Sequence, residues 1–175
     1  MHYFRDYAMT ALILGFFASA WFAWAQEKPP ETWKKPLMIA GALSLVVAAI
    51  GAFSAWRHWN DGSALSEPGA MRRYGIIAGV EFGIAAVGSI VLVLSRHRPL
   101  IPAWICLVVG VHFWPMASVL KNPSLLILGA ILCVVAVAAV LLARRSSLLP
   151  SAYAGVGAGT ALLGFACWGA VWANS

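Results

Sequence analysis

Residues 74–94 read YGIIAGVEFGIAAVGSIVLVL, an apolar run with a single charged side chain, Glu81. A helix that crosses a bilayer needs about 20 consecutive apolar residues, and this stretch provides them. A charged side chain in the bilayer interior costs on the order of a few kcal/mol, so an acid there usually has a partner or a task. The stretch therefore predicts a transmembrane helix that carries one polar group of interest.

Five further apolar runs lie before and after this stretch, separated by polar connections that contain charged residues and proline. Transmembrane β-strands need only about 10 residues and alternate in polarity, whereas these runs are longer and do not alternate. We expect six transmembrane helices that form a single all-α domain, a polytopic membrane bundle over residues 1–175. The predicted spans are residues 7–25, 37–55, 74–94, 100–119, 124–143 and 151–172.

The overall composition is that of a membrane protein. The chain is 62% hydrophobic and 10% charged, with a mean hydropathy of +0.83, whereas soluble domains carry about 25% charged residues. The six spans leave only loops, so any activity is expected within the bilayer or at its surface. The net charge of +6 does not indicate nucleic-acid binding, because the basic residues are scattered among the connections. We expect no nucleic-acid partner and no cofactor.

The distribution of Lys and Arg predicts an orientation. An even number of spans places both termini on one side, here side A, with side B opposite. Cytoplasmic connections carry an excess of Lys and Arg, which favours side B as cytoplasmic, the termini outside, and the bacterial inner membrane as the location. The basic residues of side A are Arg5, Arg57, Arg72, Arg73 and Lys121, and those of side B are Lys28, Lys34, Lys35, Arg96, Arg98, Arg144 and Arg145.

The first span also resembles a signal peptide. Arg5 precedes an apolar run that ends Ala23-Trp24-Ala25, which is similar to a cleavage site. The run is long for the hydrophobic region of a signal peptide, so we expect it to remain as a transmembrane helix.

Glycines at intervals of four predict where helices approach closely. Gly75, Gly79 and Gly83 form one stripe on the third span, and Gly155 and Gly159 lie on the sixth. Small residues at this spacing allow helices to pack closely in membranes. We expect intramolecular packing at these faces, with a homodimer seam as the alternative.

The fourth span contains a second polar side chain at depth, His112. Glu81 lies seven residues into the third span from side A, and His112 lies seven residues from the side A end of the fourth. Each is therefore roughly 10 Å deep. Two consecutive antiparallel helices thus place an acid and an imidazole at one level.

Two neighbours of His112 shape the expected site. Pro115 has no N–H to bond the carbonyl of Val111, so we expect a kink in the fourth helix at this point. Trp114 lies at a similar level. We expect a wet pocket that opens toward side A, beneath the long connection at residues 60–73, with Glu81, His112 and Trp114 at the ligand or proton site.

An acid and an imidazole at one level can share a proton near neutral pH, which suits a proton relay or a ligand site. The alternatives are a structural contact that locks the two helices together, or unrelated positions if the helical faces diverge. The leading hypothesis is a small transporter, channel-like or ligand-binding membrane protein. Two other hypotheses are an intramembrane enzyme that uses the pair as general acid and base on a lipid or lipid-linked substrate, and a structural or assembly partner that uses the glycine faces.

We expect no metal site and no disulfide framework. A metal on Glu81 and His112 needs a third ligand, and the remaining candidates by type are expected at the membrane surfaces. The cysteines lie in apolar runs, are odd in number and form no CxxC pair, so they are expected to be buried and reduced. The surface candidates are His58, Asp61 and His97, and the cysteines are Cys106, Cys133 and Cys167.

The stretch VGVHFWPMA at residues 109–117, followed by LKNP at residues 120–123, resembles an element of small bacterial six-helix integral membrane proteins. In these proteins the fourth span carries an HFxPLA-like sequence, and an Asn-Pro turn follows. Met116 stands where leucine is more usual. The families are of unknown function, so the resemblance implies a six-helix membrane fold and no activity.

Overall fold

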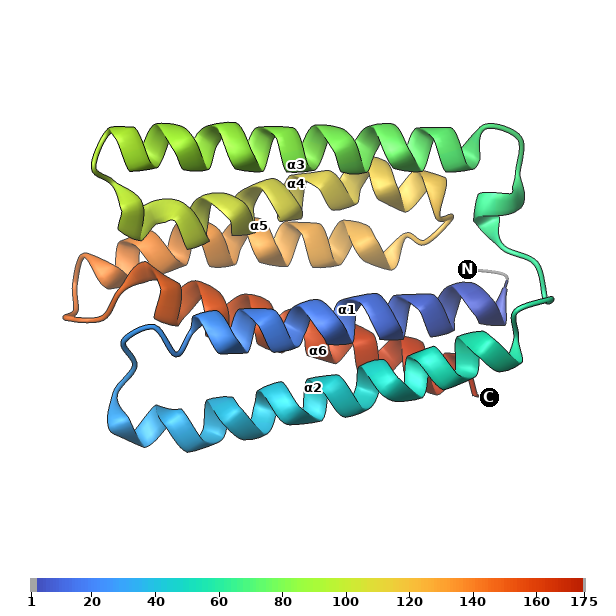
Figure 1. The fold of residues 1–175 in the computed structure, drawn as a ribbon, viewed down its shortest axis with the longest axis horizontal. Coiled ribbons are helices and arrows are strands. Elements are labelled where there is room, and N and C mark those ends of the chain that lie inside the picture. Colours follow the sequence, from blue (N-terminus) through green and yellow to red (C-terminus); the bar gives the residue numbers. More distant parts are fainter. Residues whose placement is uncertain (1–2, 175) are drawn as a thin grey trace.

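The computed structural model describes residues 3–174 of the chain, and within them every regular element is a helix. Six long helices and two short 3-10 helices, η1 and η2, make up the fold (Figure 1). The elements are α1 (Phe4–Trp24), α2 (Glu31–Arg57), η1 (Ala64–Ser66), α3 (Ala70–Leu94), η2 (Arg98–Leu100), α4 (Ile101–Val119), α5 (Ser124–Ala143) and α6 (Pro150–Trp172).

The six long helices confirm the predicted all-α membrane fold, because each is long and apolar enough to cross a bilayer. The helices extend past several predicted span ends, most clearly in α2, which begins at Glu31 rather than at residue 37. Pro36 is therefore inside α2. Pro36 leaves the carbonyl of Thr32 without an intrahelical hydrogen bond. This carbonyl is near the start of the helix, where water can donate a hydrogen bond to it.

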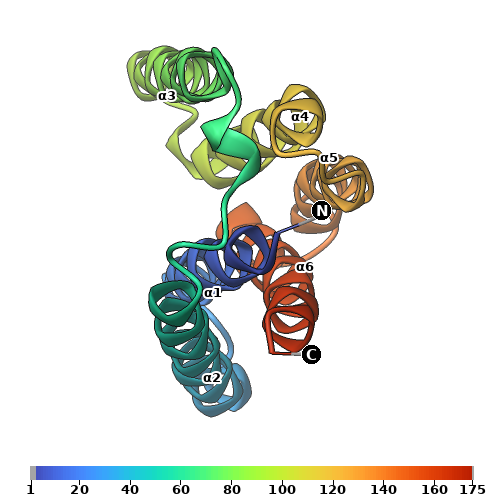
Figure 2. The ribbon, with the colours of Figure 1, turned by 90° about the vertical axis from the view of Figure 1, so that its right-hand side faces the viewer.

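The helices form an open row rather than a closed ring. Contacts between elements give the order α3, α4, α5, α6, α1, α2, and Figure 2 shows this row nearly end-on. Helix α6 also touches α2 and α4, which thickens the middle of the row. Both termini lie at the same end, side A (Figure 1). At one end of the row, α3 packs against a single long helix, α4.

Small residues allow the closest contacts around α1. A Cβ atom at Gly155 of α6 would lie 2.6 Å from the Trp21 carbonyl oxygen, and one at Gly15 would lie 2.9 Å from the Ser44 carbonyl oxygen of α2. Gly159 packs in the same way against the ring of Phe22. Helices in a bilayer associate through such close packing, because burial from lipid gives little hydrophobic driving force.

The glycine stripe of α3 is arranged differently. A Cβ atom at Gly75, Gly79 or Gly83 would meet no heavy atom within 4 Å in the described chain. The intramolecular packing expected for these three glycines is therefore not found, whereas it is found for Gly155 and Gly159. The reason is rotation, because α3 turns the opposite side of its surface toward α4, and spacing alone does not show which side is covered.

A buried acid ties the connection between α2 and α3 to the first helix. Asp6 lies in the first turn of α1 and is only 7% exposed. Its carboxylate accepts hydrogen bonds from Ser63 Oγ at 2.6 Å and from the Ala64 backbone N–H at 2.8 Å. The predicted first span begins at residue 7, so the sequence did not indicate this contact.

Two further contacts hold the same connection. Arg5 donates a hydrogen bond to the Trp59 carbonyl at 2.8 Å, and Lys121 donates one to Glu67. The hydrogen bond from Lys121 to Glu67 raises the pKa of the lysine, so the ammonium group remains charged at neutral pH. The connection is thus fixed to α1 on one side and to the turn between α4 and α5 on the other.

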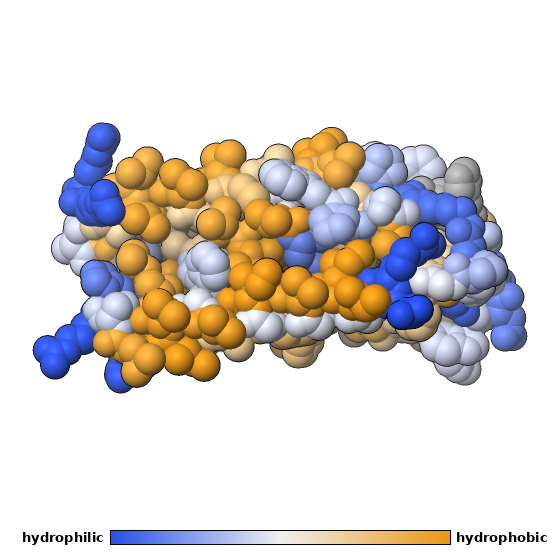
Figure 3. Space-filling model, turned by 90° about the horizontal axis from the view of Figure 1, so that it is seen from above, coloured by the Kyte–Doolittle hydropathy of each residue, from blue (hydrophilic) through white to orange (hydrophobic). Residues whose placement is uncertain are grey.

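The surface has the profile of a membrane protein. Figure 3, which looks onto the α3 side, shows a broad hydrophobic band between two hydrophilic ends. Large apolar side chains such as Phe82, Val87 and Ile90 of α3 are more than half exposed in this band. Exposed apolar area of this extent is stable in contact with lipid chains and not with water.

Replacement of Asp6 by Ala should lower the free energy of unfolding by about 2–4 kcal/mol, because a charged acceptor contributes about 1.5–3 kcal/mol per hydrogen bond and two buried donors lose their partner. Thermal unfolding in nanodiscs, followed by tryptophan fluorescence, measures this loss. Ser63→Ala should cost less, since Asp6 keeps the Ala64 N–H. Equal melting temperatures for Asp6→Ala and the wild type would show that the connection is held elsewhere.

Candidate functional site

Glu81 lies on the side of α3 that faces α4. Its side chain is 13% exposed, in contrast to the lipid-facing residues around it. The partly covered positions recur every three or four residues, which is the period of one helix face. These positions are Tyr74, Ile77, Ala78, Glu81, Ala85, Gly88, Ser89 and Leu92.

The structure brings His112 of α4 to Glu81. His112 Nε2 lies 3.5 Å from Glu81 Oε2, and the imidazole side chain is 14% exposed. The equal depths predicted from the sequence are therefore accompanied by convergent helix faces, which the sequence left open. An acid and an imidazole are in contact inside the bilayer, between two helices joined by the short turn around η2.

The second ring nitrogen constrains the protonation of the pair. His112 Nδ1 lies 3.2 Å from the Val109 carbonyl oxygen. A carbonyl oxygen only accepts hydrogen bonds, so Nδ1 carries the proton in this contact. In a neutral ring Nε2 is then an acceptor, and a hydrogen bond to Glu81 requires a protonated carboxyl. In a charged ring Nε2 donates to the carboxylate. In either form, a hydrogen bond between the two side chains would need one proton, either on the carboxyl or on the ring.

The contact is longer than a direct hydrogen bond. Well-formed N–H···O bonds have donor–acceptor distances of about 2.7–3.2 Å, and 3.5 Å lies outside this range. The two side chains are therefore neighbours across the seam at ion-pair distance, without a well-formed direct hydrogen bond.

Trp114 and Pro115 lie elsewhere on α4. The indole of Trp114 packs against Gly129 of α5 and is 47% exposed, so it does not join Glu81. Trp114 is two residues from His112, which in a helix places it on nearly the opposite face. Helix α4 continues through Pro115, whose carbonyl accepts a hydrogen bond from Ser118 Oγ at 2.8 Å. The kink at Pro115 stays a prediction.

The connection above this level does not supply a third ligand. His58 Nδ1 lies 2.5 Å from Asp61 Oδ2 at the side A surface, and these two groups form their own pair. Among the described residues, no group of three or more His, Cys, Asp or Glu side chains is placed to hold a metal ion. Glu81 and His112 thus form a two-residue polar contact, an acid beside an imidazole.

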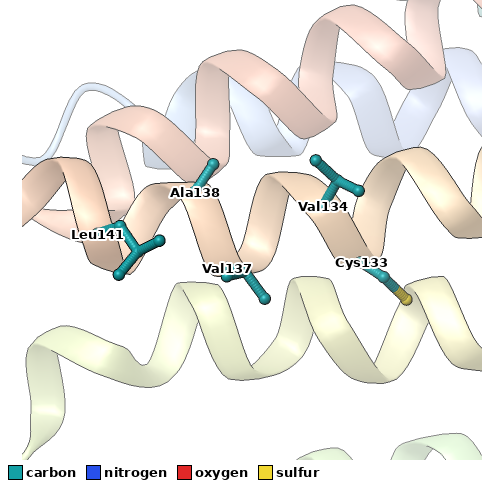
Figure 4. Close-up of a pocket in the computed structure, with 5 residues that line it drawn as sticks. All are labelled: Cys133, Val134, Val137, Ala138 and Leu141. Atoms are coloured by element: carbon teal, nitrogen blue, oxygen red, sulfur yellow. The ribbon is translucent and has the colours of Figure 1, made fainter.

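A shallow apolar depression lies on another helix. It is lined by five residues of α5, and neither Glu81 nor His112 is among them (Figure 4). Its surface is almost entirely apolar. The lining residues are Cys133, Val134, Val137, Ala138 and Leu141.

Sequence reasoning missed two polar groups in the seam between α3 and α4. Ser89 and Trp104 carry buried polar atoms without a hydrogen-bond partner among residues 3–174. Serine and tryptophan are common in membrane helices and carry no charge, so the residue types alone do not indicate a polar site. Only their positions could have indicated them. Ser89 is eight residues after Glu81 and Trp104 is eight residues before His112, so both are expected closer to side B than the pair is.

The fold and its apolar surface define an all-α integral membrane protein with six spanning helices within the described residues. No family model, no curated protein and no solved structure matches the chain. The class therefore rests on the helices and their surface, and the activity has to be inferred from the site itself.

A double-mutant cycle tests the contact at the centre of this site. Glu81→Ala and His112→Ala should be non-additive in the free energy of unfolding, with a coupling of about 0.5–3 kcal/mol, as for residues in contact. Thermal unfolding in nanodiscs provides the readout. The matched control is the cycle of Glu81→Ala with Trp114→Ala, on the opposite face of α4, which should be additive within about 0.5 kcal/mol. Additivity in both cycles would contradict the contact.

Proposed function

We propose that this protein is a small transporter or channel-like membrane protein in which the Glu81 and His112 pair binds and releases a proton or a small cationic ligand. The observation that supports the proposal most directly is the 3.5 Å contact of these two side chains at bilayer depth. Glu81 acts as the proton or cation acceptor, and His112 acts as its partner or proton donor.

The energetics of charge in the bilayer support this role. With one shared proton, the pair has no net charge, whether the proton is on the carboxyl or on the ring. Loss of that proton leaves a net negative charge, and gain of another leaves a net positive charge, and each costs several kcal/mol in a low-dielectric environment. A proton or cation therefore binds to the deprotonated pair with a large electrostatic gain. The affinity of this binding depends on how polar the surroundings of the pair are.

The position of α3 supports a coupled movement. Among the long helices, α3 packs mainly against α4, and its span has no buried residue beyond Ala70. At its side A end it is preceded by the connection that Asp6 and Lys121 hold in place. A helix held at one end and packed on one side can shift without breaking the core formed by α1, α4, α5 and α6.

Proton flux tests the proposal directly. Proteoliposomes that contain an internal pH-sensitive dye and a potassium diffusion potential should acidify when the wild-type protein is present. Glu81→Gln should reduce the flux to that of empty vesicles, because the amide does not take up a proton. Asp61→Asn, which removes an acid at the membrane surface, is the matched control and should retain the flux. Equal flux with Glu81→Gln and the wild type would overturn the proposal.

The exposed glycine stripe favours a second candidate, an assembly role through a homodimer. Gly75, Gly79 and Gly83 leave an open face on α3 to which another helix can approach closely. Gly79→Ile should then shift the protein from dimer to monomer, as counted by single-molecule photobleaching in vesicles. Gly164→Ile on α6, at an equally open glycine outside the stripe, should leave the count unchanged. A monomer in the wild type would rule this role out.

We further propose that the protein lies in the bacterial inner membrane with side B in the cytoplasm. The excess of basic residues on side B supports this orientation, and the resemblance around His112 supports the bacterial setting. In a cysteine-free background, Asp61→Cys should react with a membrane-impermeant maleimide in intact cells, whereas Ser147→Cys should react only after lysis. The reverse pattern would invert the orientation.

A further inference from the structure

The seam between α3 and α4 contains a second polar level. Three buried polar side-chain atoms lack a hydrogen-bond partner among residues 3–174, and two of them, Ser89 Oγ and Trp104 Nε1, belong to these two helices. The third, Ser151 Oγ, belongs to α6. A buried polar group without a partner is unfavourable, and in a bilayer no bulk solvent is present to compensate.

The two groups occur at the same level. Ser89 is eight residues after Glu81 on α3, and Trp104 is eight residues before His112 on the antiparallel α4. The register that joins Glu81 to His112 therefore also aligns Ser89 with Trp104, roughly 12 Å closer to side B. Direct packing agrees with this alignment, because a Cβ atom at Gly88, the neighbour of Ser89, would overlap the Trp104 indole around Nε1.

The chemistry of the two groups selects their ligand. An indole N–H only donates, and a serine hydroxyl donates or accepts. Water satisfies both, because it can accept from Trp104 and either accept from or donate to Ser89. We propose that Ser89 and Trp104 form a hydration site in the α3–α4 seam, through which water connects the Glu81 and His112 pair to side B.

Gly88 leaves room for the Trp104 indole, which packs directly against the Gly88 backbone, and α3 lies at one end of the helix row. Helix α4 is the main neighbour of α3 along the seam, so a small separation of these two helices would admit water beside the indole. Between the two levels, α3 presents Ala85, a small side chain that is partly covered. The hydration itself is independent of the proposed transport, whereas its use as a proton route rests on that function.

The indole N–H of Trp104 reports hydration directly. In protein with ¹⁵N-labelled tryptophan in nanodiscs, Trp104→Phe identifies the Trp104 resonance by its loss. This N–H should show a cross-peak to water and exchange with deuterium, and Ser89→Ala should weaken both. The exposed Trp59 of the side A connection is the positive control. A Trp104 N–H without a water cross-peak and without exchange, while Trp59 exchanges, would overturn the hydration site.

Proton flux separates this inference from the proposed function. If the route is correct, Ser89→Ala and Trp104→Phe should each slow the flux without changing the melting temperature greatly, and Glu81→Gln should abolish it. Unchanged flux in both seam variants, together with its loss in Glu81→Gln, would overturn the route and leave the proposed function intact. A hydrated Trp104 in a protein without any flux would confirm the site and refute the function.

Discussion

Inside the bilayer a polar side chain has no bulk water to solvate it, and this constraint accounts for most of the arrangement of this protein. Backbone groups are satisfied within the six helices, and large apolar side chains face outward. Glu81 of α3 is then the side chain in the interior whose burial costs the most free energy. It is turned toward α4, where His112 is its partner at 3.5 Å. The second nitrogen of that imidazole is in turn directed at the Val109 carbonyl, so the orientation of the ring is fixed by the helix that carries it.

Polar contacts at the side A end of the bundle differ from those in its middle. At side A, Asp6 accepts two short hydrogen bonds from the connection after α2, and this acid is held firmly by a serine hydroxyl and a backbone N–H. In the middle, the Glu81 contact is longer and joins an acid to an imidazole. Rigid polar contacts therefore anchor the connection to α1, and looser ones lie along the α3–α4 seam. The buried core is formed by α1, α4, α5 and α6, and α3 lies outside it at the end of the helix row.

Much of this structure is predictable from the sequence. Hydropathy and length predict all six helices, and counting residues from the polar connections predicts that Glu81 and His112 lie at one level. Counting gives depth and not rotation. For this reason Trp114, two residues from His112, packs against Gly129 of α5 rather than near Glu81, and the stripe of Gly75, Gly79 and Gly83 faces outward. Asp6 was missed because its partners, Ser63 and Ala64, are far away in the sequence and belong to a connection without hydropathic pattern. Ser89 and Trp104 were missed because uncharged residues become informative only when their partners are known.

The proposed function depends on Glu81 and His112 holding one proton between them. Infrared difference spectroscopy of the reconstituted protein across a pH titration tests this most directly. We expect a carboxyl band that disappears in Glu81→Gln and that, in His112→Ala, shifts both in frequency and in the pH at which it titrates. A Glu81 band that titrates identically with and without the imidazole would contradict the shared proton. In that case the contact would be only a neighbouring position on two packed helices.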